Sequence, residues 1–196
     1  MTQAIRLAPD RVYLYENLAN YALARQHFDE ARQIIHEAQT RNLDDFILHE
    51  ALYSLAFLGS DSAAMAEEQQ WFGRRPDYEN YGLSVASDTE AYAGHVSKAR
   101  ELNQRAVDSA IRSDNKESGA LDLANAALQE AAYGNRAEAR QSAAAALKLA
   151  PASQGVESQA ALAFAMAGDT TRAGALAQDL AKRFPLDTQM QTPFER

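Results

Sequence analysis

One order of residues recurs along the chain at a nearly constant spacing: a glycine, an alanine five positions later, and a proline twelve positions after the alanine. The complete and partial sets are Gly59/Ala64/Pro76, Gly134/Ala139/Pro151, Gly168/Ala173/Pro185, Gly94/Ala99 and Ala31. The recurring alanines are separated by 33, 35, 40 and 34 residues. A period of about 34 residues is typical of arrays of helix pairs, because one pair cannot bury its apolar face without a neighbour. The sequence therefore predicts a helical repeat protein.

Each recurring residue has a physical role in such a hairpin. Glycine supplies a backbone position open to positive φ where the first helix of a pair stops. These turn positions are expected at Gly59, Gly94, Gly134 and Gly168, with Gln26 in the first pair. Alanine, one turn into the second helix, lets two helix axes approach closely. Proline ends the second helix because it cannot continue the hydrogen-bond ladder.

This register predicts ten helices. They are expected over residues 12–25, 28–40, 46–58, 61–74, 78–93, 96–112, 118–133, 136–149, 155–167 and 170–183. The long interval between Ala99 and Ala139 contains about six extra residues, which we assign to the region around 112–118. Polar residues at helix starts are expected to cap free N–H groups, and Asn135 with Glu138 resembles a capping box.

The predicted fold class is all-α, a right-handed α-solenoid of about five helical hairpins within a single domain over residues 1–196. The repeats are expected near residues 12–44, 45–77, 78–117, 118–152 and 153–186, with partial repeats over 1–11 and 187–196. Because a solenoid needs polar outer faces on its terminal elements, these partial repeats favour a segment of a larger protein.

Composition limits the function classes. The net charge of −8 is spread over scattered Asp and Glu, whereas nucleic-acid binding favours clustered Lys and Arg. No uninterrupted apolar run approaches the ~18 residues of a membrane helix, so a soluble segment without membrane contact is expected. The chain has no cysteine, which excludes disulfides and thiolate chemistry and leaves the compartment undefined.

The first repeat contains Tyr15-x-x-Leu18-Ala19, followed by Phe28, Ala31, Ile35 and Ala38. This pattern resembles the tetratricopeptide repeat (TPR) family, and the resemblance extends over about residues 1–185. It departs from the family at the signature tryptophan, which is replaced by Tyr15, Leu48, Leu83, Leu123 and Glu157. The resemblance implies a scaffold that binds other proteins rather than an enzyme.

A second resemblance concerns the segments 91–102, 166–170 and 184–188. They are similar to the TPR region that follows the catalytic domain of some bacterial eukaryotic-like serine/threonine protein kinases, and that sometimes follows a winged-helix DNA-binding domain. This resemblance implies an alternative function, a regulatory or spacer segment attached to such a domain.

Motifs of catalysis and metal binding are missing from the sequence. The histidines are His27, His36, His49 and His95, and none belongs to an H-E-x-x-H zinc motif. There is also no phosphate-binding loop, no G-x-S-x-G elbow and no kinase H-R-D and D-F-G set. We therefore expect no catalytic residue, metal or cofactor in this segment.

The resemblance to TPR proteins implies a concave groove lined by the first helix of each pair. Residues spaced by three or four along those helices form one face. The candidate partner-binding residues are Tyr13, Glu16, Asn20, Phe46, His49, Tyr53, Phe57, Tyr81, Ser84, Asp88 and Tyr92. The face continues through Leu23, Leu121, Leu128, Ser158, Leu162 and Met166. Aromatic residues at this spacing either anchor a bound peptide or helix, or fill space between repeats.

The expected partner is a protein or peptide segment held in this groove. Some TPR proteins bind the terminal carboxylate of chaperone tails with Lys, Asn and Arg, and Asn20 matches one of these positions. Glu16 stands where a lysine is expected, and a carboxylate there would repel a bound carboxylate. Glu16 and Asp88 therefore favour a neutral or basic ligand. The favoured function is a non-catalytic interaction or sensory scaffold, and the oligomeric state is undefined by the sequence.

Overall fold

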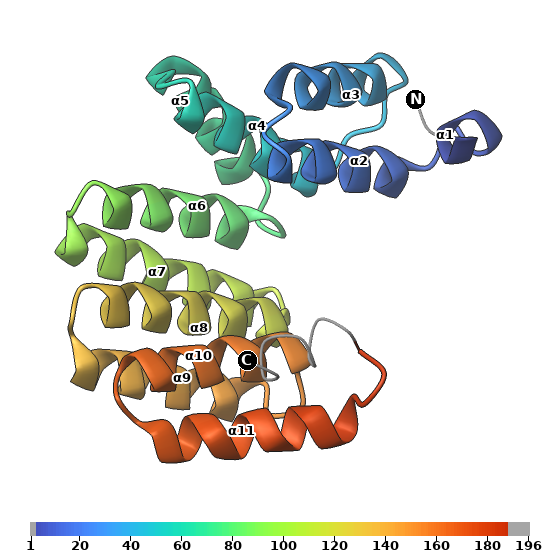
Figure 1. Cartoon of the computed structure of the whole chain (residues 1–196). Helices are drawn as coiled ribbons and strands as arrows, with labels where there is room; N and C mark the ends of the chain where they lie inside the picture. Colours follow the sequence, from blue (N-terminus) through green and yellow to red (C-terminus); the bar gives the residue numbers. More distant parts are fainter. Residues whose placement is uncertain (1–2, 188–196) are drawn as a thin grey trace. The chain divides into compact units, whose positions relative to one another are not determined.

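The computed structural model describes residues 3–187, and within this range every regular element is a helix. The helices in chain order (Figure 1) are α1 Gln3–Leu7, α2 Val12–Ala24, α3 Phe28–Thr40, α4 Phe46–Leu58, α5 Ser62–Gly73, α6 Glu79–Tyr92, α7 Val96–Arg112, α8 Lys116–Ala132, α9 Arg136–Leu149, α10 Gln154–Met166 and α11 Thr170–Arg183. The predicted all-α class is confirmed, and each of the ten predicted helices lies within two residues of its observed ends.

The described residues form two compact units, divided between Thr89 and Glu90 in the last part of α6. In unit 1, α2 pairs with α3 and α4 pairs with α5. In unit 2, α8 pairs with α9 and α10 pairs with α11. The single domain and the repeat boundaries stay predictions. The expected partial repeat over 187–196 lies, apart from Asp187, outside the described residues.

The turns after seven helices share one backbone conformation. In each turn, the residue two positions after the last helical residue has positive φ. These residues are Gln26, Asn42, Ser60, Gly94, Asp114, Gly134 and Gly168. In each case the next N–H donates to a carbonyl five residues back, as from Asn135 to Glu130 at 2.8 Å. This is the Schellman motif, which satisfies carbonyls that the helix end leaves free.

The second hairpin is displaced by one residue from the predicted register. Gly59 has a φ of −82°, and the left-handed residue is Ser60, with a φ of 56°. The predicted role of Gly59 was therefore wrong. Ala64 is likewise the third residue of α5, whereas Ala139 is the fourth residue of α9, so Met65 occupies the equivalent position. This displacement explains why Ala64 is only half-buried while Ala139 is fully buried.

The extra residues near 112–118 form helix rather than loop. Helices α7 and α8 have 17 residues each, and a short turn over 113–115 joins them. Among the polar residues expected to cap helix starts, Asp61 caps α5, since its side chain accepts from the Ala64 N–H at 3.0 Å. The predicted capping box at Asn135 was wrong, because its side chain makes no cap bond and instead donates to Glu130.

Aromatic and branched side chains form the core of unit 1. Tyr15, Ile35 and Leu48 are fully buried, and they come from α2, α3 and α4. The Tyr15 hydroxyl donates to the Pro9 carbonyl at 3.0 Å. Burial raises the pKa of Tyr15, and this hydrogen bond satisfies its polar end. The first hairpin therefore packs around Tyr15, whose hydroxyl is hydrogen-bonded.

Alanine dominates the core of unit 2. The fully buried alanines include Ala106, Ala110, Ala120, Ala124, Ala127, Ala139, Ala143, Ala146, Ala160 and Ala163. Because these side chains end at Cβ, the helices can pack at short interaxial distance. Helix α8 contacts α7, α9 and α10, and α10 contacts α8, α9 and α11. Larger buried residues, Val156, Phe164 and Leu180, close the end formed by α10 and α11.

Gly82 permits a close contact between α5 and α6. A Cβ at Gly82 would lie 2.5 Å from the Cβ of Phe72, which is 1% exposed. We expect Gly82→Ala to lower the free energy of unfolding of unit 1 by about 1–3 kcal/mol, because this overpacking exceeds the gain in helix propensity. Urea unfolding followed by the fluorescence of Trp71, the single tryptophan, measures this change.

Gly73→Ala is the matched control in the same unit, since a Cβ there meets nothing within 4 Å. It should leave the stability unchanged or slightly higher. Equal stability of the two variants would contradict the proposed packing of α6 on Phe72.

Candidate functional site

The residues of the predicted binding face differ in how far their side chains are exposed to solvent. In unit 1, Glu16, His49 and Tyr53 are buried, whereas Phe46, Phe57, Tyr81 and Ser84 are half-buried. The exposed members are Tyr13, Asn20, Asp88 and Tyr92, of which Tyr92 lies beyond the division between the units. The continuation in unit 2 places Leu162 and Met166 on the exposed side of α10, at 53% and 44% exposure. Binding at this face stays a prediction.

Helices α4 and α6 bring two of the predicted aromatic residues together. The Phe46 ring stacks on Tyr81, with 4.1 Å between the ring centroids, and on Tyr78 at 5.3 Å. Farther along the same helices, the hydroxyls of Tyr53 and Thr89 are 2.9 Å apart. The predicted face of this helix began at Tyr81 and did not include Tyr78, which lies in the turn before α6.

His49 is held by side chains of unit 1. Its Nδ1 lies 2.5 Å from Glu68 and its Nε2 lies 2.7 Å from Asp44. Carboxylate oxygens only accept, so both contacts are hydrogen bonds when both ring nitrogens donate, as in the imidazolium form. The ring also stacks on Trp71 at 3.6 Å, and the Arg75 guanidinium lies 3.9 Å from the Trp71 ring centroid on its face.

Sequence reasoning included His49 but not its partners. Trp71 and Glu68 lie on α5, a second helix, whereas the prediction considered only first helices. A recognisable signal was present, since the single tryptophan is followed closely by Phe72, Tyr78 and Tyr81. Because both nitrogens of His49 already bond within the chain, this residue contributes to the structure of the face.

Glu16 is the buried acid of the predicted face, since Asp88 is exposed. Its residue is 7% exposed, and its carboxylate makes no hydrogen bond or ion pair with any residue in the described range 3–187. Burial raises the pKa of Glu16, and the neighbouring Asp45 carboxylate raises it further. A buried, unpaired ionisable group is costly, which makes Glu16 a functional-site candidate. On either side of it along α2 are the exposed Tyr13 and Asn20.

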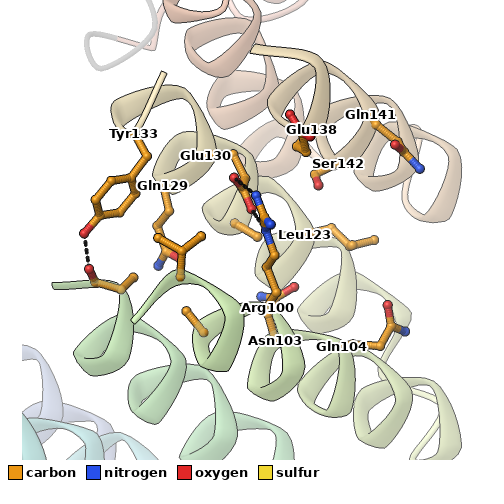
Figure 2. Close-up of a pocket in the computed structure, with 14 residues that line it drawn as sticks. Arg100, Asn103, Gln104, Leu123, Gln129, Glu130, Tyr133, Glu138, Gln141 and Ser142 are labelled. Carbon is orange, nitrogen blue, oxygen red and sulfur yellow. Dashed lines mark hydrogen bonds and ion pairs between the residues drawn. The ribbon is translucent and has the colours of Figure 1, made fainter. Parts of the chain in front are cut away.

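Unit 2 contains a pocket of about 230 Å³ that the sequence did not predict (Figure 2). Helix α7 provides Val96, Ala99, Arg100, Asn103 and Gln104, helix α8 provides Leu123, Ala126, Gln129 and Glu130, and helix α9 provides Glu138, Gln141 and Ser142; Ala91 and Tyr133 complete the lining. The Tyr133 hydroxyl donates to the Ala91 carbonyl at its edge. None of the predicted groove residues lines this pocket.

An ion pair lies in the middle of the pocket (Figure 2). Arg100 donates from Nε to one Glu130 oxygen at 2.5 Å and from Nη2 to the other at 2.8 Å. Asn135 adds a third hydrogen bond to Glu130 at 2.7 Å. The bonds from Arg100 are the main cause of the lowered pKa of Glu130, and the same pairing raises the pKa of Arg100. Glu130 is therefore held in its ionised form.

Other kinds of site are not found within the described residues. In the range 3–187, no three His, Asp or Glu side chains are grouped so as to hold a metal ion. No helix of that range combines the length and the apolar character needed to cross a bilayer.

The comparisons with known proteins identify the fold. No family model matches the chain, and no curated protein is similar to it in sequence. A solved structure is similar, the crystal structure of a thermophilic TPR protein from Thermus thermophilus. The similarity has a TM-score of 0.63 at 19% sequence identity, and it covers 94% of this chain and 97% of that one. The chain therefore has the fold of a TPR protein, an α-solenoid of helical hairpins.

The Glu130 ion pair makes the stability of unit 2 sensitive to acid. A carboxyl whose pKa is lowered in the folded state stabilises the fold at pH values above its ordinary pKa of 4.5. This contribution is lost as the pH falls through the folded-state pKa. We expect Glu130→Gln to lower the free energy of unfolding at pH 7 by about 1–2 kcal/mol, because a charge-assisted pair becomes a neutral contact. The difference from the wild type should shrink as the pH falls below that value.

Urea unfolding followed by circular dichroism at several pH values measures both effects. Glu101→Gln is the control, because Glu101 pairs with Lys98 on the surface, where both side chains are about half exposed. That variant should change stability little at any pH. A Glu130→Gln variant as stable as the wild type at pH 7 would rule out a stabilising role for the pair.

Proposed function

We propose that this chain is a non-catalytic interaction scaffold that binds a protein segment on the face formed by α2, α4 and α6 of unit 1, with a basic side chain of that segment next to Glu16. The TPR fold supports the general part of this proposal, since stacked helix pairs provide extended surfaces for binding other proteins. The environment of Glu16 supports the specific part.

Within the described residues, two other buried glutamates are paired with an arginine, whereas Glu16 is not. Glu130 and Glu157 are also buried, and each is paired with an arginine of a neighbouring helix, Arg100 or Arg183. Glu16 has no such partner among the residues in the range 3–187, although it is as buried as Glu130. A lysine or arginine supplied by a partner would provide the missing positive charge and relieve the repulsion from Asp45.

The surroundings of Glu16 suit a peptide. Tyr13 is 53% exposed and lies one turn before Glu16 on α2, so its ring can cover an extended segment at low conformational cost. Asn20, one turn after Glu16, offers an amide for hydrogen bonds to a peptide backbone. Farther along the face, the stacked rings of Phe46 and Tyr81 provide an apolar anchoring surface.

The same charges discriminate against acidic ligands. A terminal carboxylate placed on this face would meet Glu16 and Asp45, and both would repel it. We therefore favour a basic or neutral segment over the terminal carboxylate of a chaperone tail, which some TPR proteins bind.

The domain context of the chain belongs to the proposal. The resemblance of residues 91–102 to the repeat regions of bacterial kinases and winged-helix regulators favours a sensory or regulatory segment of a larger protein. The sequence of the flanking gene tests this point. If a kinase or DNA-binding domain adjoins the segment, its activity should change when the segment is deleted.

Glu16→Gln should stabilise the protein at neutral pH. A carboxyl whose pKa is raised in the folded state favours folding at pH values below its ordinary pKa of 4.5. This contribution is lost as the pH rises through the folded-state pKa. At pH 7 the ionised Glu16 therefore lowers the free energy of unfolding, and the neutral amide removes this cost. The melting temperature of unit 1, followed by Trp71 fluorescence, should rise at pH 7 and converge with that of the wild type in acid.

Glu16→Gln should at the same time weaken binding. A displayed peptide library selected on the full chain should yield peptides with lysine or arginine at one fixed position, and these should bind the variant at least about tenfold more weakly. Glu67→Gln is the matched control, since Glu67 is an exposed acid of unit 1 and the substitution changes the charge equally. A library without saturable binders would refute the scaffold, and equal binding by Glu16→Gln would refute the role of Glu16.

A further inference from the structure

The pocket of unit 2 is separate from the proposed binding face. It lies on the side of α8 that carries Leu123, Ala126 and Glu130, whereas the predicted face of that helix contains Leu121 and Leu128. Its lining residues lie within the range 91–142, all of them in unit 2. A ligand here would therefore bind independently of Glu16.

The size of the pocket limits what it can hold. Its volume of about 230 Å³ is smaller than the ~300–1,000 Å³ typical of sites for cofactors and drug-sized ligands. This space suits one side chain of a partner protein with the adjacent backbone. Ala99 of α7 and Ala126 of α8 line this space with side chains that end at Cβ.

The α7 side of the pocket offers hydrogen-bond donors. The guanidinium of Arg100 has five N–H groups, and Glu130 accepts from Nε and Nη2 only. No other residue within the described part of the chain accepts from Arg100. The remaining N–H groups, including both on Nη1, can donate to a ligand oxygen. The bidentate pairing with Glu130 fixes the guanidinium plane in advance, which lowers the cost of binding.

The α9 side offers acceptors. The Glu138 carboxylate makes no hydrogen bond or ion pair with another residue of the range 3–187. It is nevertheless close enough to contribute to the raised pKa of Arg100. Figure 2 shows Glu138 beside Ser142 on the helix that faces the Arg100–Glu130 pair. Ser142 and Gln141 add a hydroxyl and an amide oxygen to this side of the lining.

We propose that this pocket binds the carboxamide side chain of a glutamine or asparagine from a partner protein, with the amide oxygen accepting from Arg100 and the amide N–H groups donating to Glu138. A carboxamide carries an acceptor and donors on one small neutral group, as this arrangement requires. A carboxylate would meet Glu130 and Glu138, which repel it, and an ammonium group has donors only, so it could not accept from the N–H groups of Arg100.

A titration with model compounds tests the chemistry. The full chain labelled with ¹⁵N is titrated with N-acetylglutamine methylamide, and chemical shifts are followed in the amide signals of Ala126, Glu138 and Ser142. The glutamate, lysine and alanine analogues are the comparators, and the alanine analogue measures the backbone contribution alone. We expect saturable shifts with the glutamine compound and at least about tenfold weaker binding of the other three. Equal affinities, or no saturable shift with glutamine, would overturn the proposal.

Two variants separate the pocket from the surrounding surface. Ala126→Leu fills the space and should abolish binding, while circular dichroism should show an unchanged helix content. Glu138→Gln keeps the volume but removes the repulsion, so its affinity for the glutamate analogue should rise toward that for the glutamine compound. An unchanged preference in Glu138→Gln, or retained binding in a folded Ala126→Leu, would refute the proposed geometry. Glu16→Gln should bind the glutamine compound as the wild type does, which keeps this test independent of the proposed peptide face.

Discussion

The close approach of paired helices is the constraint on which the rest of this structure depends. Where alanine stands at the fourth position of a second helix, as Ala139 does in α9, the side chain is fully buried and the axes can lie near each other. Alanine contributes little apolar area, so unit 2 relies on dense packing and on ion pairs such as Arg100–Glu130. In α5 this position is held by Met65, and only Phe72 of that helix is buried. Around α5, aromatic stacking on Trp71 provides the packing contacts that closely packed alanines provide in unit 2. The same fold is thus stabilised in two different ways along one chain.

Buried charge distinguishes structural from functional carboxylates in this protein. Glu130 receives three hydrogen bonds, and its pKa is lowered as a result. Glu16 is equally buried, but its pKa is raised by burial and by Asp45. A protein can keep such an unpaired group only at a cost in stability, and sites retained at a cost are where binding is commonly found. His49 illustrates the opposite case, since both of its nitrogens are already used within the fold.

Local signals made the helices predictable, whereas side-chain pairing across repeats was not. Prolines and turn residues fixed helix ends within two residues, because these signals act through the backbone near them. The register of the second hairpin was misread, since Gly59 and Ala64 keep their mutual spacing although both are one position early. The pocket could not be foreseen, because Arg100 and Glu130 are thirty residues apart and either could have faced solvent. Likewise, the aromatic residues that follow Trp71 in the sequence indicate an aromatic cluster, but they do not indicate that Trp71 stacks on His49.

The left-handed residue two positions beyond a helix end has a wider consequence for how such proteins are recognised. Glycine occupies this place at Gly94, Gly134 and Gly168, while Gln26, Asn42, Ser60 and Asp114 adopt the same conformation. The turn therefore has the same backbone conformation in each case, even where the residue type varies. Sequence comparison does not detect this repeat where the residue type varies, because what recurs is a set of backbone dihedral angles. Superposition of structures does detect it. Two chains can therefore share this architecture at low sequence identity, as the structural match at 19% identity illustrates.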